Sequence, residues 1–298
     1  MNIAIAGGSG FVGKHLTDAL TKKGHHIYIL TRSPNRYTNT NSITYIGWLK
    51  SSFHPEKELP RLDGIINLAG DSLFGYWTKA KKERILTSRI HATKQLINLI
   101  SKMDRKPEVF INASAIGFYG TSETDIFTEQ TTEPGNDFLA RVTDEWELPA
   151  RQAEALGVRT VRARIGVILG DGGALPKMSL PFKGFIGGRI GSGEQWMSWI
   201  HIDDVVGLFS YILTNENIEG PVNITAPNPI RNKDFSKILA QVLNRPYWLH
   251  VPSTVMERLL GEMSLLLLEG QYVIPDKALI HNYVFQYPTL KASLRNIF

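Results

Sequence analysis

Seven residues near the N-terminus decide the fold: Gly7-Gly8-Ser9-Gly10-Phe11-Val12-Gly13. They follow an alternating, strand-like stretch, Asn2-Ile3-Ala4-Ile5-Ala6, and they open a segment whose apolar residues recur at helical spacing up to Lys23. One of the first two glycines allows a turn with positive φ, Gly10 lets a pyrophosphate approach the backbone, and Gly13 lets the helix lie close to the sheet. The free N–H groups of the first helical turn then face the phosphates. A strand, this turn and a helix together predict a dinucleotide-binding site.

Two other motifs come close to this pattern without fitting it. The phosphate-binding loop of NTPases shares the spacing from Gly8 to Lys14, but His15 stands where a Ser or Thr hydroxyl must reach Mg²⁺. A nucleophile elbow around Ser9 needs a glycine two residues later, where Phe11 stands.

The end of the next strand indicates which nicotinamide cofactor fits. NAD-selective sites carry an acidic residue at this point, which binds the ribose 2′-OH. This chain has Leu30-Thr31-Arg32-Ser33 with no Asp or Glu nearby, and Arg32 follows Gly13 at about the expected separation of 20 residues. A guanidinium suits a 2′-phosphate through planar bidentate hydrogen bonds. The sequence therefore predicts NADP(H), and the alternative is that Arg32 is a solvated surface side chain.

The first half of the chain alternates short apolar runs with longer helical patterns. Strands are expected at 26–30, 43–46, 64–68, 108–113 and 158–163, and helices at 79–101 and 144–156. Each crossover between parallel strands needs a helix. The alternation therefore predicts an α/β fold, a Rossmann-like doubly wound parallel sheet with a smaller C-terminal substrate-side lobe.

The later part of the chain differs from the first half in amino-acid composition. Residues 170–193 are rich in Gly and Pro, which fits either a lid beside the substrate or a long surface loop. Further helices are expected at 203–213 and 232–243, the second ending at Asn244 ahead of Pro246.

Composition narrows the possible partners. The 298 residues carry 33 basic and 28 acidic side chains, and because the net charge of +5 is spread along the chain we expect no nucleic-acid partner. No apolar run approaches the roughly 18 residues of a membrane span and no charged leader precedes the first strand. We therefore expect no membrane association and a cytoplasmic location. The absence of cysteine excludes thiolate metal sites and cysteine nucleophiles, and the scattered histidines predict no metal site.

Several motifs, in order along nearly the whole chain, carry a family resemblance. Besides the glycine turn they are Ile66-Asn67-Leu68-Ala69-Gly70, Ser88-Arg89, Ser114-Ala115-Ile116-Gly117-Phe118-Tyr119-Gly120, Arg164-Ile165-Gly166-Val167-Ile168-Leu169-Gly170, Gly191-Ser192-Gly193-Glu194-Gln195, Ser198-Trp199-Ile200-His201-Ile202-Asp203-Asp204, Leu268-Glu269-Gly270-Gln271 and Val273-Ile274-Pro275. With these, the chain resembles an extended or atypical short-chain dehydrogenase/reductase of the NAD-dependent epimerase group. More narrowly, it is similar to the "epimerase family protein" subgroup with a C-terminal domain of unknown function. The resemblance implies an NAD(P)-binding Rossmann-like epimerase domain over residues 1–230 and a small C-terminal domain over residues 249–295.

The resemblance also implies cofactor contacts beyond the glycine turn. It places Leu68, Ala69 and Gly70 along the adenine and ribose channel, Glu83 and Arg89 toward the cofactor, and Ile168 near the nicotinamide. Arg89 is a cation that could meet phosphate or ribose oxygens, whereas Glu83 could equally be an exposed helix carboxylate. The full set of expected cofactor contacts is Gly7, Ser9, Gly10, Phe11, Val12, Gly13, Thr31, Arg32, Ser33, Leu68, Ala69, Gly70, Glu83, Arg89, Ser114 and Ile168.

The catalytic pair of the resembled enzymes is missing. Active members carry Tyr-x-x-x-Lys on a helix, where the lysine lowers the tyrosine pKa for proton transfer. The corresponding residues here are Phe138 and Val142, which have no ionisable group. Ser114 and Tyr119 are candidate catalytic substitutes, and the alternative is that both are hydrogen-bonding scaffold residues. His201 and Asp203 could form a charge pair, or Asp203 could cap the helix that follows.

Two hypotheses follow for function. The first is an NADP(H)-dependent, epimerase-like oxidoreductase that acts on a small, unidentified substrate. The retained cofactor pocket and the Gly-rich residues 187–193 fit it. Separately, Trp77, Trp146, Trp196 and Trp199 could stack on a nucleotide or sugar, or they could pack in the core. The second is a non-catalytic NADPH-binding sensor or interaction protein, which the missing pair favours. The oligomeric state is not indicated by the sequence.

Overall fold

The sheet at the centre of the molecule is parallel throughout. A computed structural model describes residues 1–298, and the seven strands of this sheet lie in the order β12-β7-β5-β4-β1-β2-β3. The strands are β1 (Asn2–Ala6), β2 (His26–Thr31), β3 (Ile43–Gly47), β4 (Gly64–Asn67), β5 (Val109–Ala115), β7 (Arg159–Ile165) and β12 (Gly220–Ile224). The order reverses beside β1, where β2 lies on one side and β4 on the other. The predicted Rossmann-like doubly wound sheet is confirmed.

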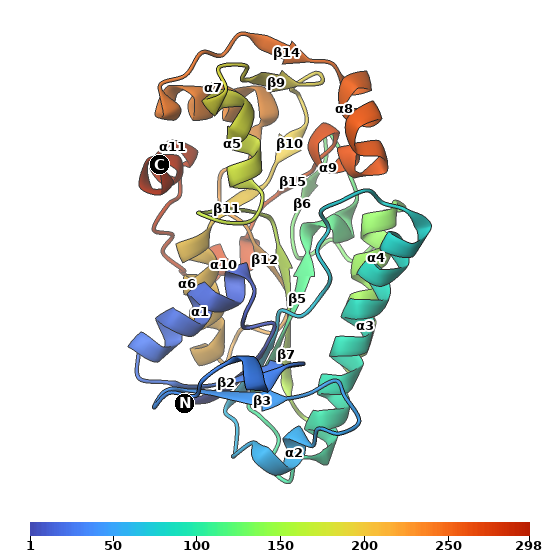
Figure 1. The fold of residues 1–298 in the computed structure, drawn as a ribbon, viewed down its shortest axis with the longest axis vertical. Coiled ribbons are helices and arrows are strands. Elements are labelled where there is room, and N and C mark those ends of the chain that lie inside the picture. The colour runs from blue at the N-terminus through green and yellow to red at the C-terminus, as the bar shows by residue number, and fades with distance from the viewer.

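Helices cover both faces of this sheet, as Figure 1 shows. On one face α1 (Phe11–Lys22) and α6 (Ile202–Thr214) pack on the odd residues of β1, in a core that contains Ile3 and Ile5. On the other face the even residues of β1 meet α3 (Lys79–Lys102), and α4 (Phe138–Ala150) packs against α3. Successive side chains of a strand point to opposite faces, so a strand buried on both faces reads as continuous apolar sequence.

A smaller lobe lies beyond the carboxyl ends of the strands, at the top of Figure 1. The lobe has a hydrophobic core of its own, which joins α5 (Leu175–Lys183), α7 (Asn232–Leu243) and α11 (Leu290–Ile297). The strands β9 (Gly188–Ile190) and β14 (Leu249–Val251) pair above them. The remaining elements are α2 (Pro55–Glu58), β6 (Ile126–Phe127), β8 (Val167–Leu169), β10 (Trp196–Met197), β11 (Trp199–His201), β13 (Ile230–Arg231), α8 (Ser253–Leu260), α9 (Leu265–Leu268), β15 (Tyr272–Val273) and α10 (Asp276–Ile280), with 3₁₀ turns at Pro34–Arg36, Ile116–Tyr119, Arg151–Leu156 and Gly261–Ser264.

Two expected elements differ from the structure. The helix expected at 144–156 begins at Phe138, because the side chain of Asp137 accepts hydrogen bonds from the N–H groups of Leu139 and Ala140. It gives way to a 3₁₀ turn soon after Pro149, which has no N–H to donate. The long surface loop considered for 170–193 is wrong, since α5 and β9 lie within it and bury Leu175 and Phe182.

Two further observations concern the helices. Asn244 ends α7 in the left-handed conformation, with φ of 52°, as expected for a helix that stops ahead of a proline. None of the helices combines the length and the apolar character needed to cross a bilayer.

Candidate functional site

The glycine turn between β1 and α1 has the geometry of a phosphate cradle. Gly7 has a φ of +80°, and a Cβ there would lie 2.7 Å from the carbonyl carbon of Leu68. A Cβ on Gly13 would lie 2.4 Å from the oxygen of Gly7, so this position tolerates no side chain. A Cβ on Gly10, by contrast, would meet only the Gly7 oxygen at 3.2 Å, which leaves its outer side open. No side chain caps the N-terminus of α1, so its first N–H groups remain free for a ligand. The residues present therefore fit the diphosphate of a dinucleotide.

The end of β2 presents an unpartnered cation. Arg32 is exposed and makes no hydrogen bond or ion pair with any other residue of the chain. The neighbouring backbone is fixed, since the N–H of Ser33 donates to Oγ1 of Thr31 at 3.3 Å and the Thr31 carbonyl accepts from Trp48 at 3.0 Å. A guanidinium held at a fixed strand end, with its donors free, is suited to bind an anion.

The loop after β4 joins the glycine turn. Leu68 donates its N–H to the oxygen of Ala6, the last residue of β1, at 2.8 Å. The N–H of Ala69 donates to Oδ1 of Asn67 at 3.1 Å, and Asn67 is itself held by Asn112 of β5. These bonds place Leu68 to Gly70 directly beside the turn, at the carboxyl edge of the parallel strands where α/β proteins bind ligands.

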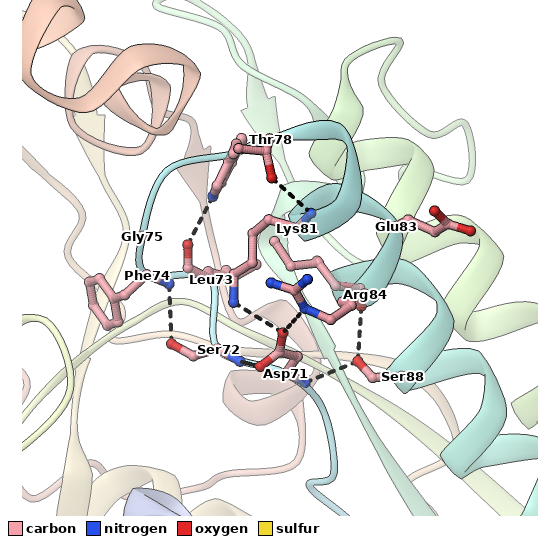
Figure 2. Close-up of polar contacts among 12 residues, drawn as sticks. Asp71, Ser72, Leu73, Phe74, Gly75, Thr78, Lys81, Glu83, Arg84 and Ser88 are labelled. Carbon is pink, nitrogen blue, oxygen red and sulfur yellow. Dashed lines mark hydrogen bonds and ion pairs between the residues drawn. The ribbon is translucent and has the colours of Figure 1, made fainter.

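A polar cluster around Asp71 holds the next part of this loop (Figure 2). The ammonium of Lys81 lies 3.0 Å from a carboxylate oxygen of Asp71, and Nε of Arg84 lies 3.7 Å from the same oxygen. The hydrogen bond from Lys81 lowers the pKa of Asp71, against the opposing effect of its partial burial. The Asp71 N–H donates to Oγ of Ser88 at 3.0 Å. Glu83, an expected cofactor contact, is exposed and points away from this cluster in Figure 2.

Arg89 lies on α3 beneath the same loop. Its Nη1 donates to the carbonyls of Asp71 and Ile85, at 3.0 and 2.9 Å, and its guanidinium lies 5.1 Å from the centre of the Trp146 ring. Burial lowers the pKa of Arg89 to about 10, against the opposing charge of Asp71. A Cβ on Gly70 would lie 3.1 Å from the guanidinium carbon. The structure therefore brings Gly70 and Arg89 together, with the guanidinium supporting the loop after β4.

Phe11 connects the glycine turn to the segment after β8. A Cβ on Gly170 or Gly172 would lie within 2.8 Å of its ring. His15, one turn along α1, lies 3.1 Å from Asp171. Ile168, within β8, is half-buried against the sheet core. The turn, the β4 loop and residues 168–173 thus converge at one edge of the sheet.

Ser114 takes part in a buried ionic network. Its hydroxyl donates to Oε1 of Glu147 at 2.7 Å, and Glu147 on α4 is fully buried. Arg164, the register partner of Ser114 on β7, donates from Nε and Nη2 to the two carboxylate oxygens of Glu147 at 2.8 and 3.0 Å. Burial opposes the charge of Arg164, but the bonds to Glu147 outweigh it and raise its pKa. A second arginine, Arg162, lies 3.3 Å from the same carboxylate.

Tyr119 belongs to the same buried region. Its ring lies 4.9 Å from the guanidinium carbon of Arg164, and its hydroxyl donates to Oδ1 of Asn223 at 2.7 Å. Burial raises the pKa of Tyr119 to about 12, against the opposing charge of Arg164. A phenol with such a pKa is a weak proton donor or acceptor near neutral pH.

The positions that correspond to the missing pair are used for packing. Phe138 stacks edge-on against Trp77, with ring centres 5.3 Å apart, and the ammonium of Lys82 lies 4.8 Å from the Phe138 ring centre. Val142 is 3% exposed and belongs to an apolar cluster with Trp77 and Ile85. No side chain at either position exchanges protons.

His201 and Asp203 are close, but the cap differs from the expected one. Nδ1 of His201 accepts a hydrogen bond from the N–H of Asp203 at 3.1 Å, so His201 caps α6 and the assignment of Asp203 as the cap is wrong. Asp203 lies in the first turn, where its negative charge faces the positive end of the helix dipole. No group of three histidine, aspartate and glutamate side chains could hold a metal ion.

The four tryptophans considered for stacking have different surroundings. Trp199 is fully buried and donates to the carbonyl of Asn228, while Trp146 is 6% exposed and donates to Oγ1 of Thr93. Trp77 is buried, and Trp196 is half-buried beneath the guanidinium of Arg231. Trp146 is the one that lies beside Arg89.

Comparisons with known proteins identify the family. Residues 3–225 match the model of the NAD dependent epimerase/dehydratase family, and residues 251–297 match a domain of unknown function, DUF1731. The epimerase family protein YfhF of Bacillus subtilis is 48% identical over 297 residues, which cover 100% of this chain and 98% of YfhF. The epimerase family protein SH2119 of Staphylococcus haemolyticus is 41% identical over 294 residues, 98% of this chain and 97% of SH2119.

Solved structures agree in fold. The crystal structure of human epimerase family protein SDR39U1 with NADPH has a TM-score of 0.87 and 30% identity, and the match covers 100% of this chain and 99% of that one. UDP-glucuronic acid 4-epimerase from Bacillus cereus, in complex with UDP-glucuronic acid and NAD, has a TM-score of 0.80 and 19% identity over 100% and 98% of the two chains, which shows a shared fold. The resemblance predicted from the motifs is confirmed: this chain belongs to the NAD dependent epimerase/dehydratase family and has its NAD(P)-binding, Rossmann-like fold.

Proposed function

We propose that the protein binds NADPH in preference to NADH and is an epimerase-like oxidoreductase for a small polar substrate. The observation that carries the cofactor preference is the free guanidinium of Arg32 at the end of β2, with no carboxylate near it to bind a ribose hydroxyl. The NADPH held by human SDR39U1, at 30% identity, supports the same preference. We also propose a cytoplasmic location for the protein.

The chain's own residues divide the binding of the cofactor between them. The glycine turn would hold the diphosphate through the N–H groups of α1, and Arg32 would hold the 2′-phosphate, flanked by Thr31 and Ser33. Leu68 to Gly70 would lie along the adenosine, with Arg89 supporting that loop from below. NADPH, when bound, supplies a hydride.

The proton that must accompany a hydride has no obvious donor among the expected residues. The hydroxyls of Ser114 and Tyr119 already donate to Glu147 and Asn223, and both side chains are less than 5% exposed. This observation favours a second candidate function, a non-catalytic protein that binds NADPH and reports on it or contacts a partner. In that case Ser114 and Tyr119 serve as scaffold.

Calorimetric titration of Arg32→Ala tests the cofactor preference. A charge-assisted hydrogen bond contributes about 1.5–3 kcal/mol, so the variant is expected to lose about ten- to a hundredfold in NADPH affinity. Its NADH affinity should stay within about twofold, because NADH has no 2′-phosphate. Arg36→Ala, an exposed arginine on the following 3₁₀ turn, is the matched control and should bind both cofactors normally. Equal losses for the two cofactors would refute the proposal.

Turnover distinguishes the two candidate functions. NADPH oxidation is measured with the purified protein across a panel of sugars and carbonyl compounds. Substrate-dependent oxidation that disappears in Gly13→Ala supports the oxidoreductase. Tight NADPH binding without turnover on any compound, together with capture of a partner only when NADPH is present, supports the sensor.

A further inference from the structure

The end of the smaller lobe gathers three segments without a single acidic residue. Residues 172–193, 235–256 and 289–298 contain no Asp or Glu, although the chain as a whole has 28. They form α5 with β9, most of α7 with β14, and α11, and these elements pack on one another. In Figure 1 they lie together around the top of the molecule. Charges that are spread along the sequence are therefore segregated in the fold.

Five cations surround this end of the lobe. Lys237 and Arg245 line one hollow of about 450 Å³, together with Gln241 and Asn244. Gln241 and Asn244 also line a second hollow, whose cations are Lys291 and Arg295. Lys183 lies on the same side, with its ammonium 5.2 Å from the ring centre of Phe298. Two opposing charges belong to the same elements, the C-terminal carboxylate of the chain and Asp234, whose carboxylate is 3.9 Å from Lys237. We call these five cations and the side chains between them the basic face.

Large apolar side chains protrude from the same face. Leu180, Phe185, Ile186 and Trp248 are 63%, 56%, 53% and 67% exposed. Trp248 donates from Nε1 to the carbonyl of Phe185 at 3.0 Å, and Arg245 lies 4.6 Å from the Phe185 ring centre, so apolar and basic groups interleave. Phe185 has a φ of +63°, a conformation that non-glycine residues rarely adopt. The turn after α5 thus holds two apolar side chains in water at a cost in backbone strain.

We propose that the basic face binds the surface of an anionic phospholipid bilayer. Cations close to such a surface are attracted by its negative potential, and Trp and Phe side chains insert at the level of the headgroups. Leu180 and Ile186 decide between this partner and a single-stranded nucleic acid, because aliphatic side chains do not stack on bases whereas they do enter the acyl boundary. The sequence predicted no membrane association, because the charges are spread along it and no apolar run is long enough to span a bilayer. The basic face forms only when the three segments pack together, so the sequence does not show it.

Vesicle sedimentation with the full-length protein tests the proposal. The vesicles consist of phosphatidylcholine with phosphatidylglycerol at about 2:1, and of phosphatidylcholine alone. The protein should sediment with the anionic vesicles only, and high salt should release it. Lys183→Ala/Arg245→Ala should weaken binding about thirtyfold, since each removed cation accounts for about a fivefold change. Lys94→Ala/Arg105→Ala, which removes two exposed cations from the other end of the molecule, is the matched control and should bind normally.

A second pair of variants examines the apolar contribution. Leu180→Ser/Trp248→Ser should lose binding, whereas Val284→Ser, at a residue 83% exposed elsewhere, should keep it. Thermal melting reports whether each variant is folded. If Leu180→Ser/Trp248→Ser is unfolded, the test rests on the variants that remove cations. Absence of vesicle binding, equal binding to neutral vesicles, or retention of an oligothymidylate without retention on vesicles would each overturn the proposal. The last result would assign the surface to single-stranded nucleic acid.

Discussion

Replacing Glu147 with Gln should destabilise the protein far more than any surface change on the same helix. The carboxylate of Glu147 is fully buried and accepts hydrogen bonds from Ser114 and from two nitrogens of Arg164. Arg162 contributes a second buried positive charge beside it. A glutamine keeps the volume but removes the negative charge that Arg164 pairs with and that Arg162 shares with Glu154, whose carboxylate lies 2.8 Å from Arg162.

The expected size of the effect follows from the burial of these groups. The side chains of Arg164 and Arg162 are 3% and 11% exposed, so little water can replace the lost carboxylate. Breaking a buried ion pair by removing one partner costs about 3–5 kcal/mol. Unfolding entropy scales with length, and for a chain of 298 residues it gives about 0.6 kcal/mol per degree near the midpoint. The melting temperature of Glu147→Gln should therefore fall by about 5–8 °C.

Melting curves followed by calorimetry or dye binding measure this difference, and Glu145 supplies the control. Glu145 pairs with Arg141 on the exposed side of α4 at 2.8 Å, so Glu145→Gln should cost at most about 0.5 kcal/mol and shift the midpoint by less than about 1 °C. Ser114→Ala removes one donor from a carboxylate that keeps Arg164, and it should cost about 1.5–3 kcal/mol. A Glu147→Gln midpoint within 1 °C of the control would show that the network does not support the fold as described. Scaffold roles for Ser114 and Tyr119 would then lose their basis.

Two further predictions concern the glycine turn and one histidine. Gly13→Ala would place a Cβ 2.4 Å from the oxygen of Gly7, so the turn must open. The NADPH affinity measured by calorimetry should therefore fall about tenfold or more. Lys14→Ala, at the neighbouring exposed position, is the control and should bind NADPH normally. Burial lowers the pKa of His201 from 6.5, against the opposing charges of Asp203 and Asp204. Below pH 6.5 the folded protein therefore binds fewer protons at this site than the unfolded chain does. The folded state should lose stability as the pH falls through 6.5. The melting temperature of His201→Asn, which keeps a capping acceptor, should decline less between neutral and mildly acidic pH, and an unchanged decline would contradict this assignment.

The elements that the sequence predicted well depend on short-range patterns. The geometry of the glycine turn and the order of strands and helices follow from spacings of a few residues within one segment. Even the helix boundary that was misplaced, at Phe138, has a local cause, since Asp137 is the kind of residue that caps a helix immediately ahead of an apolar run.

The buried network could not be predicted in this way. Glu147 lies 33 residues after Ser114 and 17 before Arg164, on a helix between two strands that only the fold makes adjacent. In the sequence Glu147 stands close to two other acidic residues of α4, Asp144 and Glu145, and carries no motif. Two arginines at alternate positions of a strand, in the run Arg162-Ala163-Arg164, were the one available signal, because charges on the same side of a buried strand need a counter-charge.

Packing also explains why the missing catalytic pair could not be restored by simple replacement. A lysine at position 142 would take the place of a valine that is 3% exposed among Trp77 and Ile85, and burial of that kind favours the neutral amine. A tyrosine at position 138 would carry its hydroxyl into the contact between Phe138, Trp77 and Lys82, which helps to hold the loop before α3 against α4. That loop is tied in turn to the smaller lobe, since the hydroxyl of Tyr76 donates to the carbonyl of Leu259 at 2.6 Å. The helix face that exchanges protons in the resembled enzymes has therefore become, in this chain, part of the apolar contact that joins the sheet domain to its lobe.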